Sequence, residues 1–339
     1  MFRRLLRGLS VLFLLLVAIF VGGIVAFWTP DIDRATLEKY YAGPDSAFVM
    51  TASGARIHYR DQGLREGSAI LLIHGTGASL HSWESWAHLL GENYRIITLD
   101  LPAHGLTGAT PDGDYGRSGM IAAIEAVVSA TGLDRFVIGG NSMGGEMALA
   151  YALAHPGRVR GLVLVDSAGL GRTALPANGS SSRSVPIAFR IARMTALRWL
   201  VTKVTPRALI EEGLRSVYAD DSRIDDLAID RYWHLLRLEG SRAAMMARFA
   251  DSSRETDPLP VERLTMPSLV LWGEQDRLIP PDYGRALAAR LPEARFISYA
   301  DAGHVPMEEI PERSVADVRR FLAMLRDLDV QTKVVSVEN

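Results

Sequence analysis

The sequence predicts an α/β fold in which a mostly parallel, eight-stranded sheet carries an inserted helical cap and follows one N-terminal transmembrane helix. Six short apolar runs recur between stretches of helical periodicity, at 69–73, 94–99, 136–140, 162–165, 268–272 and 295–299. Several runs are apolar throughout, which is typical of parallel strands covered on both faces. Two earlier segments, 48–51 and 55–59, flank Ser53-Gly54 and predict a hairpin that leads into the sheet.

The first thirty residues differ from the rest of the chain. Three arginines precede an uncharged run over 9–28, about the 20 residues that a membrane-spanning helix needs. With Asp31 and Asp33 after the run, this charge bias predicts a cytoplasmic amino end and an extracytoplasmic remainder. A cleaved signal peptide, leaving a secreted or periplasmic protein, is the alternative, although the run is long and lacks an Ala-x-Ala ending. A buried core helix is a third interpretation, but only Ser10 interrupts the apolar run.

The alternation of strands and helices breaks between 168 and 259, where a Gly/Ser-rich segment precedes helical stretches rich in Arg, Met and Leu. We interpret this stretch as the cap. The predicted divisions are 1–30 as membrane anchor or signal peptide, 31–46 as linker, 47–167 with 260–328 as core, 168–259 as cap and 329–339 as C-terminal tail. A helix expected to begin at Ser314 closes the core, with a buried stripe of Val315, Val318, Phe321, Leu322 and Leu325.

Composition excludes several classes of function. The 37 basic and 39 acidic residues leave a net charge of −2, so nothing indicates a nucleic-acid partner. Cysteine is absent, which excludes disulfides, thiolate nucleophiles and zinc–thiolate sites. The hydrophobic share of 48% supports a sizeable core and argues against general disorder. The chemistry must therefore come from other side chains.

A candidate nucleophile lies between a predicted strand and a predicted helix. The pentapeptide from Gly140 to Gly144 reads Gly-Asn-Ser-Met-Gly, follows the strand 136–140 and precedes the helical run 146–154. A strained strand-to-helix turn lifts a serine oxygen above the sheet, and the glycines allow the close backbone approach. An ordinary glycine-rich turn is the alternative. The order of strand, turn and helix favours Ser142 as nucleophile.

An acid and a base follow in the expected order along the chain. Asp276 comes just past the strand 268–272, and His304 comes just past the strand 295–299. The carboxyl ends of parallel strands meet at one edge of the sheet, where such folds gather their sites. We therefore predict that His304 is the general base and that Asp276 orients it. Asp166, at the end of the preceding strand, is the competing acid.

The loop His74-Gly75-Thr76-Gly77 directly follows the predicted strand 69–73, at the same edge of the sheet. An oxyanion needs two backbone donors, and we assign them to the N–H groups of Thr76 and Met143, the residue after the nucleophile. His74 is interpreted as holding this loop through hydrogen bonds, without a catalytic role.

Five motifs together resemble the α/β-hydrolase superfamily. They are the His74-Gly75 loop, the turn Asp100-Leu-Pro-Ala-His-Gly105, Gly140-Asn-Ser-Met-Gly-Gly145, Trp272-Gly-Glu-Gln-Asp276 and Ala302-Gly-His304-Val-Pro-Met-Glu308. The resemblance covers residues 47–328 and implies acyl transfer through a Ser142 acyl-enzyme, with no metal and no organic cofactor. Members that process halides and epoxides carry aspartate at the position of Ser142, which argues against both activities.

The resemblance does not single out one reaction; we favour hydrolysis of carboxylic esters, on small to medium apolar substrates bound under the cap, because it asks least of the site beyond the parts already found. Carbon–carbon bond hydrolysis of ring-fission products is the alternative, because relatives with that activity share Gly-Asn-Ser-Met-Gly-Gly. Those relatives usually have a tryptophan after the catalytic histidine and Gly-Pro-Gly in the oxyanion loop, where this chain has Val305 and Thr76-Gly77-Ala78. An alternative of another class is a membrane-tethered, non-catalytic binding module. The presence of Ser142, Asp276 and His304 together argues against it. Candidate cap residues for the pocket are Phe189, Trp199, Tyr218, Trp233, Met245, Met246 and Phe249, with Arg183, Arg190 and Arg193 as candidate carboxylate ligands.

Overall fold

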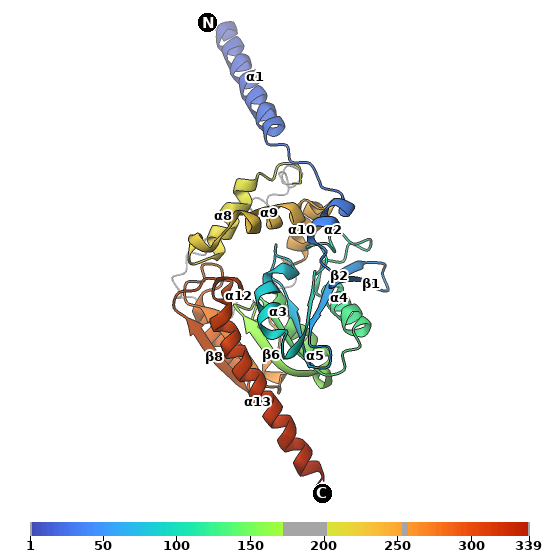
Figure 1. The fold of residues 1–339 in the computed structure, drawn as a ribbon. Helices are drawn as coiled ribbons and strands as arrows, with labels where there is room; N and C mark the ends of the chain where they lie inside the picture. Colours follow the sequence, from blue (N-terminus) through green and yellow to red (C-terminus); the bar gives the residue numbers. More distant parts are fainter. Residues whose placement is uncertain (1, 172–201, 253–256, 338–339) are drawn as a thin grey trace.

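The structure, a computed structural model, describes residues 2–171, 202–252 and 257–337 (Figure 1). Its centre is one eight-stranded sheet with the order β1-β2-β4-β3-β5-β6-β7-β8, which confirms the predicted sheet. The pairs β1–β2 and β2–β4 are antiparallel, and the remaining pairs are parallel. The strands are β1 Ser46–Met50, β2 Arg56–Gly63, β3 Ser68–Ile73, β4 Tyr94–Leu99, β5 Phe136–Asn141, β6 Val159–Val165, β7 Ser268–Gly273 and β8 Ala294–Tyr299.

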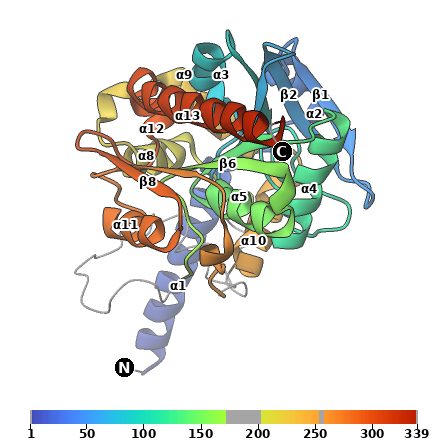
Figure 2. The ribbon, with the colours of Figure 1, turned by 90° about the horizontal axis from the view of Figure 1, so that it is seen from below.

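Helices cover both faces of the sheet, as the uninterrupted apolar strands predict. Along β3, Ile70 and Leu72 face one layer while Leu71 and Ile73 face the other. Figure 2 shows α3 and α13 on one side of the sheet and α4, α5 and α11 on the other. These helices are α3 Glu84–Leu90, α4 Arg117–Ala130, α5 Met143–Ala154, α11 Pro281–Arg290 and α13 Pro311–Val337, and the short α12 Pro306–Glu309 precedes α13.

The closing helix α13 begins three residues earlier than the sequence predicts. Its first residue is Pro311, whose fixed φ and missing N–H suit the first position of a helix, so the expected start at Ser314 is wrong. The Ser314 hydroxyl is buried inside the helix, where it donates to the carbonyl of Ile310 and accepts from the indole of Trp86. The predicted apolar stripe is buried as expected. The helix continues to Val337, through the segment interpreted as a tail.

In the described part of the segment between β6 and β7, the regular elements are helices joined by loops. Within residues 202–252 three α-helices are described, α8 Arg207–Val217, α9 Asp226–Leu236 and α10 Ser241–Ser252, and we call them the cap helices. In Figure 1 they lie between α1 and the sheet. Several predicted cap residues lie outside the described residues: Arg183, Phe189, Arg190, Arg193 and Trp199.

The amino-terminal helix α1 spans Phe2–Ala26 and projects from the rest of the molecule (Figure 1). Its window Leu9–Ala26 has a mean hydropathy of 2.9 and is 0% buried, so the interpretation as a core helix is wrong. By length and composition this helix is able to cross a membrane. The predicted linker is structured: helix α2, Arg34–Tyr41, begins after Asp33, whose carboxylate accepts the N–H of Thr36.

Candidate active site

Ser142 lies at the sharp turn between β5 and α5. Its backbone has φ 54° and ψ −119°, a conformation that costs energy for a residue with a Cβ. The two flanking positions have no room for a side chain, so both must be glycine. A Cβ at Gly140 would lie 2.3 Å from the carbonyl carbon of Gly144, and one at Gly144 would lie 2.1 Å from the carbonyl oxygen of Ile73. The turn leaves Ser142 partly exposed between buried neighbours.

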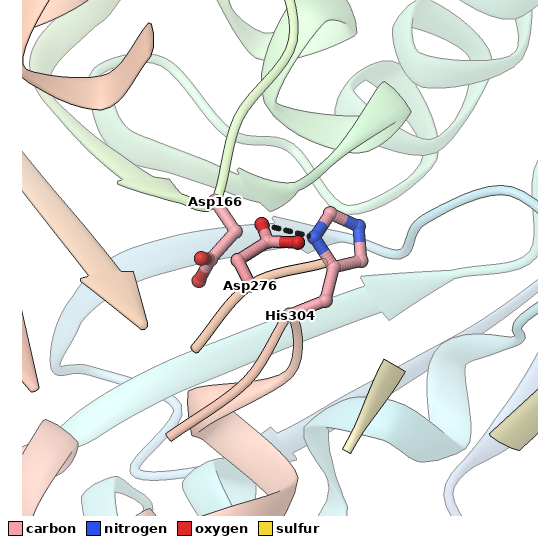
Figure 3. Close-up of side chains that lie close together, drawn as sticks. All are labelled: Asp166, Asp276 and His304. Carbon is pink, nitrogen blue, oxygen red and sulfur yellow. Dashed lines mark hydrogen bonds and ion pairs between the residues drawn. The ribbon is translucent and has the colours of Figure 1, made fainter. Parts of the chain in front are cut away.

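The structure brings His304 and Asp276 together, although 28 residues separate them in the chain. His304 Nδ1 and Asp276 Oδ2 are 2.7 Å apart, and both side chains are almost fully buried (Figure 3). The other carboxylate oxygen of Asp276 accepts the N–H groups of Leu278 and Ile279 at 2.7 and 3.0 Å. The ionised carboxylate has only acceptors, so Nδ1 carries the proton and Nε2 of His304 keeps a free lone pair.

Asn141 holds the histidine loop against the nucleophile strand. Its side-chain amide donates to the carbonyl of Val165 at 3.1 Å and to the carbonyl of His304 at 2.9 Å. The residue immediately before Ser142 therefore fixes the backbone of His304. Sequence reasoning missed this role, because the position between glycine and serine in the motif accepts any residue and carries no signal of its own.

The oxyanion loop lies directly beside the nucleophile. A Cβ added to Gly75 would lie 3.2 Å from Cβ of Ser142, and the Thr76 hydroxyl donates to Met143 Sδ at 3.4 Å. The side chains of the two predicted donor residues are therefore in contact, and neither backbone N–H is used by a hydrogen bond in the described part of the chain.

His74 supports this loop in the way the sequence analysis interprets it. Its Nδ1 donates to the carbonyl of Gly75 at 2.8 Å, and its Nε2 accepts the N–H of Leu101 at 3.1 Å. Burial lowers the pKa of the His74 imidazole, which keeps the ring neutral. A neutral ring with one donor and one acceptor satisfies both contacts.

Asp166 lies beside His304 and Asp276 but forms different hydrogen bonds (Figure 3). One oxygen or nitrogen atom from each of Asp166, Asp276 and His304 lies within 4.8 Å of the others. Asp166 Oδ1 accepts the N–H of Gly273 at 3.0 Å, whereas its buried Oδ2 has no hydrogen-bond partner. Burial, together with the negative charge of Asp276, raises the pKa of Asp166 well above the ordinary range. The folded structure therefore favours the protonated form of the Asp166 carboxyl group.

The cap helices are fastened to the histidine loop by a buried acid. Glu309 accepts the N–H of Gly303 with Oε1 and that of Ala219, just after α8, with Oε2, both at 2.8 Å. The N–H of His304 donates to the carbonyl of Val217 in the same helix at 2.7 Å. Glu309 is 1% exposed, and burial raises its pKa. The sequence analysis missed Glu309, since a carboxylate in an acidic helical turn ordinarily faces solvent.

One aromatic residue suggested for the pocket packs onto the core instead of standing free. The Tyr218 hydroxyl donates to Glu308 at 2.8 Å, and Tyr232 donates to the other oxygen of the same carboxylate at 3.0 Å. Tyr218 is buried by these contacts. It therefore belongs to the junction between cap helices and core.

Comparisons with known proteins agree with the observed fold. Residues 68–311 match the alpha/beta hydrolase fold family. Lipase 1 of Psychrobacter immobilis is 27% identical over 280 residues, covering 82% of this chain and 84% of the lipase. The 2-hydroxymuconate semialdehyde hydrolase of Pseudomonas putida is 30% identical over 293 residues, covering 83% of this chain and 95% of that protein. A solved membrane phospholipase A, described as a bacterial virulence factor, has a TM-score of 0.69 and 26% identity over 96% of this chain and 99% of its own.

The family match runs from the first residue of β3 to the first residue of α13, which is well over half of the chain. It includes Ser142, Asp276 and His304. The named relatives are enzymes, which argues against a non-catalytic binding module. The chain therefore belongs to the α/β-hydrolase fold family and is a hydrolase of that family.

Proposed function

We propose that this protein is a carboxylic-ester hydrolase that works through an acyl-enzyme on Ser142 and acts on small to medium apolar substrates. The observation that carries the proposal is the 2.7 Å bond from His304 Nδ1 to Asp276, which leaves Nε2 as a base. This arrangement is the one that activates a serine hydroxyl in acyl transfer. The lipase and membrane phospholipase relatives support ester substrates.

In the proposed reaction Ser142 Oγ attacks the ester carbonyl carbon while its proton passes to His304 Nε2. Asp276 stabilises the imidazolium that forms. The carbonyl oxygen becomes an oxyanion and is received by the N–H groups of Thr76 and Met143, each worth about 3 kcal/mol to the transition state. His304 then gives its proton to the leaving alcohol, and a water molecule, deprotonated by His304, releases the acid.

A fluorophosphonate probe tests the nucleophile directly. We expect the folded protein to be labelled, and Ser142→Ala to abolish labelling. Ser129→Ala, an exposed serine on α4, is the matched control and should label like the wild type. Failure of the folded wild type to label would contradict the serine-hydrolase mechanism.

Carbon–carbon bond hydrolysis is a second candidate, favoured by the 30% identity to the semialdehyde hydrolase. Val305 and Thr76-Gly77-Ala78 depart from the pattern of such relatives. A p-nitrophenyl butyrate assay beside a ring-fission dienoate assay separates the two. We expect the ester to have the higher kcat/KM; the opposite ranking would assign the second activity.

We also propose that α1 is a membrane anchor and that the catalytic domain lies outside the cytoplasm. The exposed apolar window Leu9–Ala26 and the arginines before it support this orientation. Intact-mass analysis of protein from the membrane fraction tests it, with the full chain expected. A mature chain that begins after α1 would indicate a cleaved signal peptide and a secreted or periplasmic enzyme.

A further inference from the structure

We propose that the segment 29–32 clamps the cap helices to the membrane surface, so that the enzyme takes its acyl esters from the lipid bilayer rather than from water. The inference rests on the proposed ester hydrolysis and deepens it by naming the substrate class, a membrane-lipid acyl ester. The partner it requires is a phospholipid bilayer. Four observations carry it.

The first observation is that the backbone after α1 pairs with the backbone of the cap. Thr29 N–H donates to the carbonyl of Lys203, and Ile32 N–H donates to the carbonyl of Arg237, both at 2.8 Å. Glu239 N–H returns a bond to the carbonyl of Ile32 at 3.1 Å, and Ile32 forms a parallel bridge with Leu238. The segment 29–32 is therefore bound to the cap and is not a flexible linker.

The second observation is a buried charged side chain that bonds the cap to the same segment. Arg242 of α10 is 3% exposed and donates to the Thr29 carbonyl at 2.7 Å and to Asp31 at 2.6 Å. Its other terminal nitrogen donates to the Thr205 hydroxyl at 3.3 Å. Because a buried guanidinium that loses its partner is costly, the lock opposes detachment of the segment from the cap.

The third observation is the short distance between the apolar helix and these contacts. Helix α1 ends at Ala26 and Thr29 is already bound to the cap, so three residues span at most about 10 Å. Each headgroup layer is about 5–8 Å thick, judged from the difference between the whole bilayer and its hydrocarbon core. With α1 in the membrane, the adjoining part of the cap lies at the headgroup layer.

The residues at this level have the chemistry of a membrane interface. An open pocket lies between the end of α1 and the cap, lined by Trp28, Pro206, Trp233 and Arg237 among others. The Arg237 guanidinium lies over the Trp233 ring at 4.2 Å, and Lys203 lies 5.9 Å from the ring of Trp28. Tryptophan beside arginine and lysine is typical of the layer where lipid phosphates and water meet.

The fourth observation is that the cap joins the membrane-facing side to the catalytic side. On its far side the cap binds the backbone of His304 through Val217 and that of Gly303 through Glu309. In Figure 1 the cap helices stand between α1 and the sheet. The cap therefore links the residues beside α1 to the loop that carries His304.

A linker insertion tests the proposal in the full chain. Ten Gly/Ser residues inserted between Ala26 and Phe27 preserve every contact of the segment 29–32 but move the cap away by about 17 Å on average. Wild type and variant are reconstituted in vesicles of phosphatidylcholine and phosphatidylglycerol. Two rates are measured, fatty-acid release from the vesicle lipid and hydrolysis of dissolved p-nitrophenyl butyrate.

We expect the insertion to leave the rate on the dissolved ester unchanged and to lower the rate on vesicle lipid by about tenfold or more, since it removes the high local concentration of lipid. Equal lipid rates in the two proteins would overturn the inference, as would a wild type that hydrolyses only the dissolved ester. A wild type inactive on both esters would instead contradict the proposed ester hydrolysis.

The absence of cysteine permits a second, structural readout. Glu239→Cys places a fluorophore beside Ile32, and Met324→Cys on α13 places one on the side away from α1 (Figure 1). Lipids with nitroxide headgroups should quench the label at 239 and leave the label at 324 bright. The insertion should relieve the quenching at 239. Equal quenching at both positions would show that the cap does not face the membrane.

Discussion

Two buried aspartates lie beside one histidine, and the hydrogen bonds of their oxygens separate their roles. Asp276 accepts bonds on both oxygens, from His304 and from the backbone of Leu278 and Ile279. Asp166 accepts one bond, from Gly273, and its second oxygen is buried without a partner. Three donors stabilise a negative charge on Asp276, whereas two charged carboxylates at this spacing would repel each other.

This contrast predicts opposite effects of two isosteric substitutions. We expect Asp276→Asn to lower kcat by about 10³–10⁴-fold, because the histidine loses its preferred tautomer and the stabilisation of its cation. Asp166→Asn should keep kcat within about tenfold, since asparagine resembles the protonated carboxyl group that burial favours at this position. Steady-state hydrolysis of p-nitrophenyl butyrate measures both. Retention of activity only in Asp276→Asn would make Asp166 the acid.

Asp166 also predicts how stability depends on pH. Its pKa in the folded chain is raised, so the folded state holds this proton more tightly than the unfolded state. The associated stability is complete below the ordinary carboxyl range and is lost as pH rises toward the folded pKa, by at most about 1.4 kcal/mol per pH unit. Asp166→Asn has no proton to lose.

Melting temperatures of wild type and Asp166→Asn between about pH 4 and pH 8 check this sign. The wild type should lose stability relative to the variant as pH increases. Parallel curves for the two proteins would show that Asp166 is ionised in the folded chain.

Among single residues, the sequence predicts those whose role is indicated by their immediate neighbours in the chain. Ser142 stands in a glycine motif between strand and helix, so its turn was predictable. The bond from His304 to Asp276 was predictable in part, because Asp166 ends a neighbouring strand and only the folded geometry shows which acid meets the ring. The bond from Asn141 to the His304 carbonyl joins residues 163 apart, and no pattern in the sequence indicates it.

Among the elements, the link between α8 and the histidine loop depends on one buried carboxylate. Glu309 uses its two oxygens for two backbone N–H groups, those of Gly303 and Ala219. Glu309→Gln replaces one acceptor by an NH₂ group that opposes a donor. An unsatisfied buried N–H costs about 1–3 kcal/mol, so we expect a lower melting temperature together with a lower kcat as the histidine loop loosens.

Glu312→Gln, an exposed residue at the start of α13, is the matched control and should change neither quantity. Thermal unfolding and esterase kinetics on the two variants decide the matter. If Glu309→Gln behaves like this control, the hydrogen bonds of Glu309 to Gly303 and Ala219 contribute nothing to the position of His304.

The elements were more predictable than their ends. The strands were found because uninterrupted apolar runs between turn residues have few alternatives. The start of α13 was misplaced because Ser314 followed by Asp317 resembles a cap, whereas Pro311 begins the helix and Ser314 bonds back to Ile310. Helix α2 in the supposed linker was missed, since eight residues with one buried leucine give a weak periodic signal.

At the scale of the whole molecule, the ion pair between Asp31 and Arg242 connects the amino-terminal segment with the cap. Asp31→Ala leaves the buried guanidinium with neutral acceptors only, and we expect a loss of about 3 kcal/mol in the free energy of unfolding. The double variant Asp31→Ala/Arg242→Met removes the stranded charge and should recover part of that loss. Denaturant unfolding of the two single variants and the double variant forms the cycle that measures the coupling. Simple additivity would mean that the two residues do not cooperate.

The attachment of the anchor to the cap could not be predicted from the sequence. Hydropathy and flanking charge indicate a spanning helix, but they describe the helix alone. The bridge from Ile32 to Leu238 and the bond from Arg242 to Thr29 join segments about two hundred residues apart. Nothing in either segment identifies the other.

The bridge between Ile32 and Leu238 also orders events in time. A chain that emerges from its amino end presents Ile32 long before Leu238 and Arg242 have been synthesised. Contacts between distant parts of a chain also cost more loop-closure entropy than local contacts. The segment beside the anchor therefore has no partner in the cap until β1 to β6 have been synthesised, and we expect its pairing with Leu238 and Arg242 to form late in folding.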